Sequence, residues 1–117
     1  MNSLRLTPVP EGTRWASGES VDLAVLPMTA EELATRVGRP LVRGVDDGIG
    51  AWAAIGGRLP FGRDVEFIWY ANLPGQVTLR VAKGMPYPAT LDEALRVVGL
   101  TRADVRVNPL AKTADGA

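Results

Sequence analysis

Hydrophobic and polar residues alternate most clearly over residues 64–71, which read Asp-Val-Glu-Phe-Ile-Trp-Tyr-Ala. Aromatic and β-branched residues of this kind favour a β-strand. Successive side chains of a strand point to opposite faces. One face would hold Val65, Phe67, Trp69 and Ala71, and the other would hold Asp64, Glu66, Ile68 and Tyr70. The segment therefore predicts a strand with large apolar groups on both faces.

Several other runs are strand-like, at residues 21–26, 41–45, 50–55, 77–83 and 105–107. An edge strand is also expected over Leu4–Val9, because prolines bound it. Asp47-Gly48 is a strong hairpin signal and would join residues 41–45 to 50–55. Pro74 and Gly75 stand where a type II turn places them. These signals predict an antiparallel meander through the middle of the chain.

Two segments carry the same helix signals. In each, a threonine (Thr29 or Thr90) is followed three residues later by a glutamate (Glu32 or Glu93), as in a capping box. Each segment ends in a glycine suited to the left-handed position after a helix. We expect short helices there, with an apolar face formed by Leu33, Val37, Leu91, Leu95 and Val98. A β-α-β duplication would also give this arrangement, but identity beyond the cap residues is poor, so we favour two independently capped helices.

These elements predict a single α+β domain over residues 1–107 and a flexible C-terminal tail over 108–117. The chain has 117 residues, which suits one domain. We expect an antiparallel sheet of about five strands with two short helices on one of its faces, because packed layers of this kind bury one apolar face of each element.

Composition narrows the chemistry, because the chain has no histidine and no cysteine. Histidine is the side chain whose unperturbed pKa lies nearest neutrality, and cysteine is a strong nucleophile and metal ligand. We therefore expect neither an enzyme nor a cofactor. Thirteen basic residues balance thirteen acidic ones, so no basic excess indicates a nucleic-acid partner. Without an apparent signal peptide or an apolar stretch that could span a membrane, we expect a cytoplasmic protein with no membrane partner.

The candidate contact surface is the sheet face away from the helices, together with the adjoining turn. Tyrosine and tryptophan often anchor protein interfaces, and an uncovered apolar face marks a partner site. The predicted partner-binding residues are Asp46, Asp47, Trp52, Glu66, Ile68 and Tyr70. The alternative is a strand buried on both sides, with Glu66 paired to Arg80 on the neighbouring strand.

One resemblance adds to this interpretation. The residues that carry it are Gly50-Ala51-Trp52, Leu59–Ile68, Pro74-Gly75 and the helix at 90–98. In these segments the chain resembles small proteins of high-GC actinobacteria, some of which are similar in size and architecture to immunity proteins that neutralise a toxin. The resemblance implies a protein that binds and occludes a toxin domain. Immunity proteins against nucleases tend to be acidic and this chain is neutral, so the class of toxin stays open.

The sequence therefore predicts a non-catalytic protein-binding module, and most concretely an immunity protein. Two alternatives remain open. The first is a homodimeric structural or accessory protein that uses the same face for self-association. The second is a small ligand-binding or carboxylate-dependent enzyme domain that uses Asp46, Asp64 or Glu66.

Overall fold

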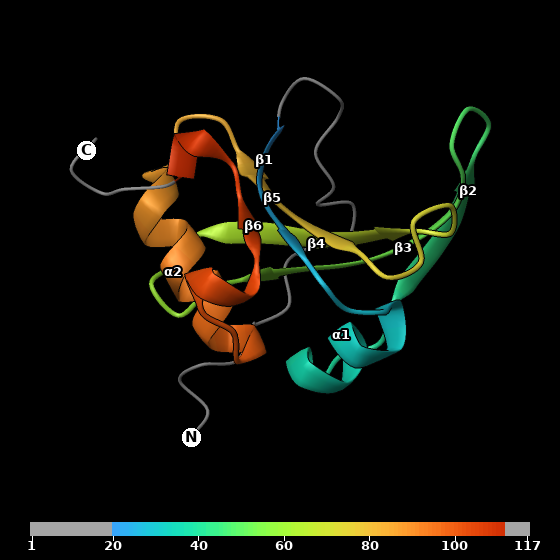
Figure 1. The fold of residues 1–117 in the computed structure, drawn as a ribbon, viewed down its shortest axis with the longest axis horizontal. Coiled ribbons are helices and arrows are strands. Elements are labelled where there is room, and N and C mark those ends of the chain that lie inside the picture. The colour runs from blue at the N-terminus through green and yellow to red at the C-terminus, as the bar shows by residue number, and fades with distance from the viewer. Residues whose placement is uncertain (1–19, 112–117) are drawn as a thin grey trace.

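A computed structural model describes residues 20–111. Within them the chain forms an antiparallel sheet of six strands and two α-helices, one of them between β1 and β2 and the other between β5 and β6 (Figure 1). The elements are β1 (Ser20–Leu26), α1 (Ala30–Val37), β2 (Val42–Asp46), β3 (Gly50–Arg58), β4 (Asp64–Tyr70), β5 (Val77–Ala82), α2 (Tyr87–Val98) and β6 (Arg106–Val107). The α+β class is confirmed. The predicted strand at Leu4–Val9 lies outside the described residues.

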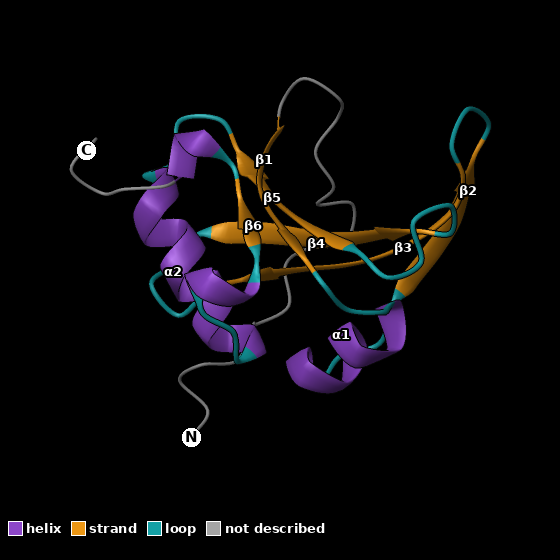
Figure 2. Ribbon diagram, viewed as in Figure 1, coloured by secondary structure: helices purple, strands orange, loops and turns teal. Residues whose placement is uncertain are grey.

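The strands lie in the order β2-β3-β4-β5-β1-β6 (Figure 2). β2 to β5 form the predicted meander, in which each strand pairs with the next. β1 then pairs with β5 on one side and with β6 on the other, so the first described strand lies between two late ones. The register of β1 shifts between Asp22 and Ala24, which lets the extra residue, Leu23, join Ala24 in the core.

Helix α1 begins and ends where its sequence predicts. Thr29 Oγ1 accepts a hydrogen bond from Glu32 N, and Glu32 Oε1 accepts one from Thr29 N, each at 3.1 Å. These two bonds satisfy donors that a helix start leaves open. Gly38 ends the helix with φ = 76°, a conformation that glycine adopts at little cost. The local capping pattern therefore sets both limits of this helix.

The predicted capping box of the second helix is wrong. Helix α2 begins at Tyr87, one turn earlier, with Pro88 in its first turn, where a proline's missing N–H is tolerated. Thr90 therefore lies inside the helix and is fully buried, and its Oγ1 contacts no hydrogen-bond partner among the described residues. Glu93 is also buried, 1% exposed, and its carboxylate bonds to a loop rather than to Thr90. Thr90 and Glu93 are therefore interior residues of the helix and do not cap it.

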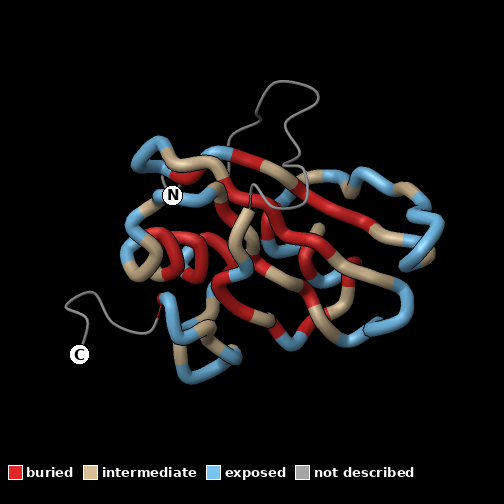
Figure 3. The backbone as a smooth tube through the Cα atoms, turned by 90° about the horizontal axis from the view of Figure 1, so that it is seen from above, coloured by how far each residue is buried: buried red, intermediate tan, exposed pale blue. Residues whose placement is uncertain are grey.

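The core lies between the sheet and the two helices, which cover the same face. Figure 3 shows that the buried residues lie in the interior of the molecule and that the exposed ones lie mostly in the loops around it. Val65 and Phe67 of β4 are buried in this core. So are all the helix positions that the sequence predicted, namely Leu33, Val37, Leu91, Leu95 and Val98. Arg36 also joins the two helices, because its Nη1 donates to the Val98 carbonyl at 2.7 Å.

Two further predictions need correction. Gly75 does not have a positive φ, so the β4–β5 turn is not type II. The packed structure also continues past residue 107: Asn108 N donates to the Leu23 carbonyl at 2.8 Å, and Pro109–Ala111 form a short 3-10 helix in which Ala111 is buried. The rest of the predicted tail, 112–117, lies outside the described residues.

Candidate protein-binding surface

The most exposed apolar strand lies at one edge of the sheet. β2 pairs only with β3, and its other side has no strand neighbour in the described sheet. Val42 is 59% exposed and Val45 is 78% exposed, although valine is usually buried. Ile49, in the turn that follows, is 47% exposed. We call Val42–Asp46, together with the turn through Ile49, the edge surface. At its far end, the sheet and this hairpin project beyond α1 (Figure 1).

Asp46, one of the predicted contact residues, has a structural role in the hairpin turn. Asp46 Oδ1 accepts a hydrogen bond from Gly48 N at 2.9 Å, and the Asp46 carbonyl accepts one from Ile49 N at 3.2 Å. Gly50 then adopts φ = 98°, so the loop closes as a turn followed by a glycine in the left-handed region. Asp46 and Asp47 are both exposed. Asp46 therefore shapes the turn, and both carboxylates place negative charge at the tip of the edge surface.

Trp52 and Tyr70 lie directly opposite one another on β3 and β4, on the face away from the helices. Both are half-buried. The indole of Trp52 extends over β2 at Gly44, its partner in the ladder. A Cβ atom added to Gly44 would lie 2.6 Å from Trp52 Cε2 and closer still to Cζ2. The absence of a side chain at Gly44 therefore lets the tryptophan pack across the edge strand.

Glu66 and Ile68 do not belong to an exposed face. Each is 1% exposed, so the prediction that they contact a partner on an open sheet face is wrong for the structure as described. The alternative, in which β4 is buried on both faces along this stretch, is confirmed for these two residues. Of the six predicted contact residues, Asp46, Asp47, Trp52 and Tyr70 remain accessible in whole or in part.

Glu66 instead forms the cross-strand pair that the sequence suggested. It lies opposite Arg80 on β5, and Arg80 Nη1 is 3.8 Å from Glu66 Oε1. Arg80 Nε also donates to Asp22 Oδ1 at 3.1 Å. Burial opposes the charge on Arg80, but hydrogen bonds to Tyr70 and Asp22 raise the pKa of its guanidinium above the ordinary value. One guanidinium on β5 thus joins two carboxylates, one on each neighbouring strand.

The carboxylates proposed for an enzyme or a cation site do not converge. Asp64 bonds to Arg58 through two contacts, at 2.8 and 3.3 Å, and this hydrogen bond raises the pKa of Arg58. Glu66 faces Arg80, and Asp46 lies at the hairpin turn. Among residues 20–111, no group of three or more acidic side chains could hold a metal ion.

Another exposed apolar residue, Phe61, lies beyond the opposite end of β3. Phe61, in the β3–β4 loop, is 74% exposed, yet its backbone N donates to the buried Glu93 Oε2 at 2.7 Å. Leu59 N donates to the Arg63 carbonyl at 2.7 Å, and Gly62 N donates to Leu59 O at 2.8 Å. A charged acceptor gives a strong hydrogen bond. Helix α2 therefore fixes the loop that presents Phe61.

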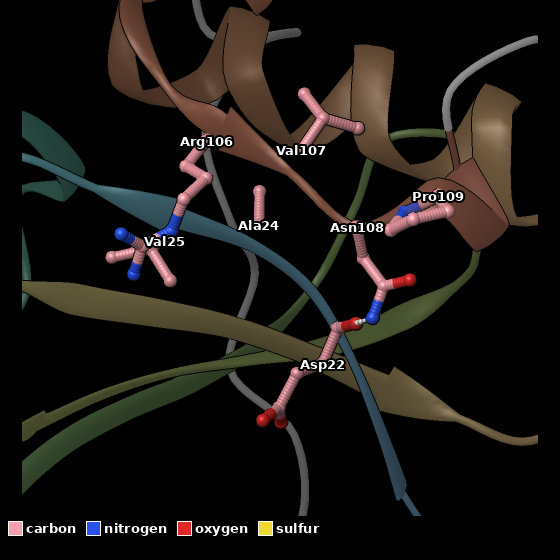
Figure 4. A pocket seen from close by; sticks show the side chains of 7 residues that line it. All are labelled: Asp22, Ala24, Val25, Arg106, Val107, Asn108 and Pro109. Atoms are coloured by element: carbon pink, nitrogen blue, oxygen red, sulfur yellow. Dashed lines mark hydrogen bonds between the residues drawn. The ribbon is translucent and has the colours of Figure 1, made fainter.

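A shallow pocket lies beside β6 (Figure 4). Its volume is about 250 Å³, and its walls come from β1, β6 and the residues after β6. The side chain of Asn108 points to β1, where its Nδ2 donates to the Asp22 carbonyl at 2.8 Å. That amide is thus already engaged. Asp22 and Arg106 offer one charge of each sign, with no convergent set of polar groups for a small ligand.

Sequence reasoning missed Val42, Val45 and Ile49 as surface residues. The missing information was strand order: a meander leaves its first strand at an edge unless another strand covers it. The sequence held one signal of this, because the 41–45 run places Arg43 and Gly44 between its two valines, a poor composition for a central strand.

Within the described range, neither helix has the length and apolar character needed to span a bilayer. Searches of protein-family models, curated proteins and solved structures found no match to this chain.

Proposed function

We propose that this protein is a non-catalytic protein-binding module that docks its partner on the edge surface. The observation that carries the proposal is the exposure of Val42 and Val45 on a five-residue strand whose outer side lacks a strand neighbour in the described sheet. An open strand edge offers a row of backbone donors and acceptors to another extended chain. Valines on the two faces of β2 would supply apolar contacts above and below the added strand.

The neighbouring residues support specificity. Asp46 and Asp47 form an acidic tip at one end of β2, and Arg43 lies nearer the other end. Charges around an apolar contact select a partner and fix its register more than they add affinity. Trp52, packed over Gly44, provides a half-buried aromatic group beside the strand, a common type of interface anchor.

The immunity-protein hypothesis is a narrower form of this proposal. In that form the partner is a toxin domain, and docking on β2 occludes its working site. Its support is the resemblance in the sequence, and the edge surface adds only a means of contact. The identity of the captured partner distinguishes this narrower form from other protein-binding roles.

The test is affinity capture from the native host with cross-linking, using the wild-type chain and two variants. Val45→Lys places a charge on the open edge, and Leu110→Lys is the control, because Leu110 is 56% exposed but lies beyond β6. We expect wild type and Leu110→Lys to capture the same protein, and Val45→Lys to lose it. Undiminished capture by folded Val45→Lys would overturn the proposal.

A further inference from the structure

The geometry of the two sheet edges points to a second copy of this chain as the partner on β2. We propose a two-fold dimer in which two β2 strands pair antiparallel. This inference rests on the proposed function, because it assumes that the edge surface is the docking site. It goes further by naming the occupant and the register.

The described sheet has one edge long enough for such pairing. The opposite edge is β6, which has only two residues and is flanked by the 3-10 helices Arg102–Asp104 and Pro109–Ala111. A contact between unlike edges could continue from molecule to molecule, whereas β2 pairing with its own copy uses the same edge twice and closes. The structure thus favours an assembly that stops at two chains.

Symmetry restricts the register. A two-fold axis perpendicular to a continuous sheet keeps every side chain on its own face, and residues opposite each other in the sheet must share a face. The two β2 strands must therefore be centred on one residue that lies opposite its own copy. Centring on Arg43 or Asp46 places like charges against each other. Centring on Gly44 places Arg43 opposite Val45. Centring on Val45 places the two valines in contact. It also brings Arg43 of each copy next to Asp47 of the other, the first turn residue after β2, so the opposite-charge pair occurs twice.

The Val45-centred register also suits the backbone. The Asp46 carbonyl bonds to Ile49 N in the turn, so this residue directs its carbonyl toward the β3 side. Because backbone groups alternate along a strand, those of Arg43 and Val45 point to the open edge. Arg43 does have a neighbour, Glu31 of α1, at 3.8 Å, but both side chains are more than half exposed and such a pair is weak. The Arg43 side chain can therefore turn to Asp47 of a second copy.

The first measurement is molar mass in solution, by size-exclusion chromatography with light scattering, up to about 1 mM protein, where even association with a millimolar Kd is visible. We expect a mass approaching twice the 12.5 kDa of one chain, and the monomer mass for Val45→Lys. Leu110→Lys serves as the matched surface control and should dimerise as wild type does.

The second measurement tests the register by charge reversal. Arg43→Asp and Asp47→Arg each place like charges opposite one another, and each should raise the dimer Kd at least about tenfold. A one-to-one mixture of the two variants restores both opposite-charge pairs, so it should form a heterodimer with about the wild-type Kd. Far-ultraviolet circular dichroism and urea midpoints would verify that each variant is folded.

The outcomes separate this inference from the proposed function. A wild-type dimer with unchanged affinity in both single reversals, or no recovery on mixing, overturns the dimer as described here. A monomeric wild type whose capture of another protein is abolished by Val45→Lys overturns the inference and leaves the proposed function standing. If the wild type is monomeric and Val45→Lys captures the same proteins as the wild type, both the dimer and the proposed function are overturned.

Discussion

The contact between Gly44 and Trp52 can be tested by adding one methyl group. In Gly44→Ala, the new Cβ would lie 2.6 Å from Trp52 Cε2 and nearer still to Cζ2, so the indole must move. Forcing such an overlap costs typically about 1–3 kcal/mol. Alanine otherwise stabilises a strand interior over glycine by roughly 0.5–1 kcal/mol, because glycine loses more freedom on folding. We expect a net loss of about 1 kcal/mol in the free energy of unfolding.

The effect of Gly44→Ala on the free energy of unfolding should change sign once the indole is removed. Trp52→Val places a β-branched residue, which suits a strand, in β3 and leaves no ring to extend over Gly44. In that background, Gly44→Ala should stabilise the protein by several tenths of a kcal/mol, through its backbone effect alone. The coupling between the two sites is then about 1.5 kcal/mol, within the range of residues in direct contact.

Urea unfolding of the four proteins, wild type, each single variant and the double variant, measures this coupling. With a slope of about 1 kcal/mol per molar urea, Gly44→Ala should lower the wild-type midpoint by about 1 M. Near-ultraviolet circular dichroism would report a displaced indole in the same variant. The reasoning is refuted if Gly44→Ala changes stability equally in both backgrounds, or leaves the wild-type midpoint unchanged.

Two more predictions concern the helices. Thr90→Val should leave stability unchanged or raise it by up to about 1 kcal/mol, because it removes a buried hydroxyl that has no hydrogen-bond partner among the described residues. Thr29→Val removes a true helix cap and should cost about 1 kcal/mol. Similar urea midpoints for the two variants would contradict the assignment of Thr29 as a cap and Thr90 as an interior residue. Glu93→Ala should cost about 2–4 kcal/mol of stability, because it removes the charged hydrogen bond to Phe61 N and leaves a cavity. Glu93→Gln keeps an acceptor oxygen and should cost clearly less. Equal losses for the two variants, measured by calorimetry, would count against that hydrogen bond.

Local signals were enough to predict α1 and the hairpin after β2. Thr29 and Glu32 bond to each other's backbone within one helical turn, and Asp46 bonds within its own turn, so neighbours in sequence decide both structures. The same pattern at Thr90 and Glu93 misled, because there the residues face the core and the helix had already begun at Tyr87. A capping motif does not reveal whether its side chains are exposed.

The candidate site depended on facts that no local pattern contains. The alternation along β4 correctly separated Val65 and Phe67 from Glu66 and Ile68, but exposure of the second pair depends on what covers that face. Glu66 and Arg80 could be matched because opposite charges on adjacent strands suggest a pair. Val42 and Val45 were assigned to a strand, yet their exposure follows from the strand order, which brings β1 between β5 and β6 and leaves β2 outermost.

The position of β1 has a consequence for how the chain folds. β2 to β5 can assemble through successive hairpins between sequence neighbours, which close short loops quickly. β1 cannot join them so early, because Leu26 pairs with Val77 and Ala24 pairs with Val107. During synthesis the first described strand leaves the ribosome before either of its partners exists. Its docking closes the longest loops in the sheet, an entropic cost that contacts between neighbouring strands do not share. The last of these pairings, between Ala24 and Val107, therefore cannot form until residue 107 has been made.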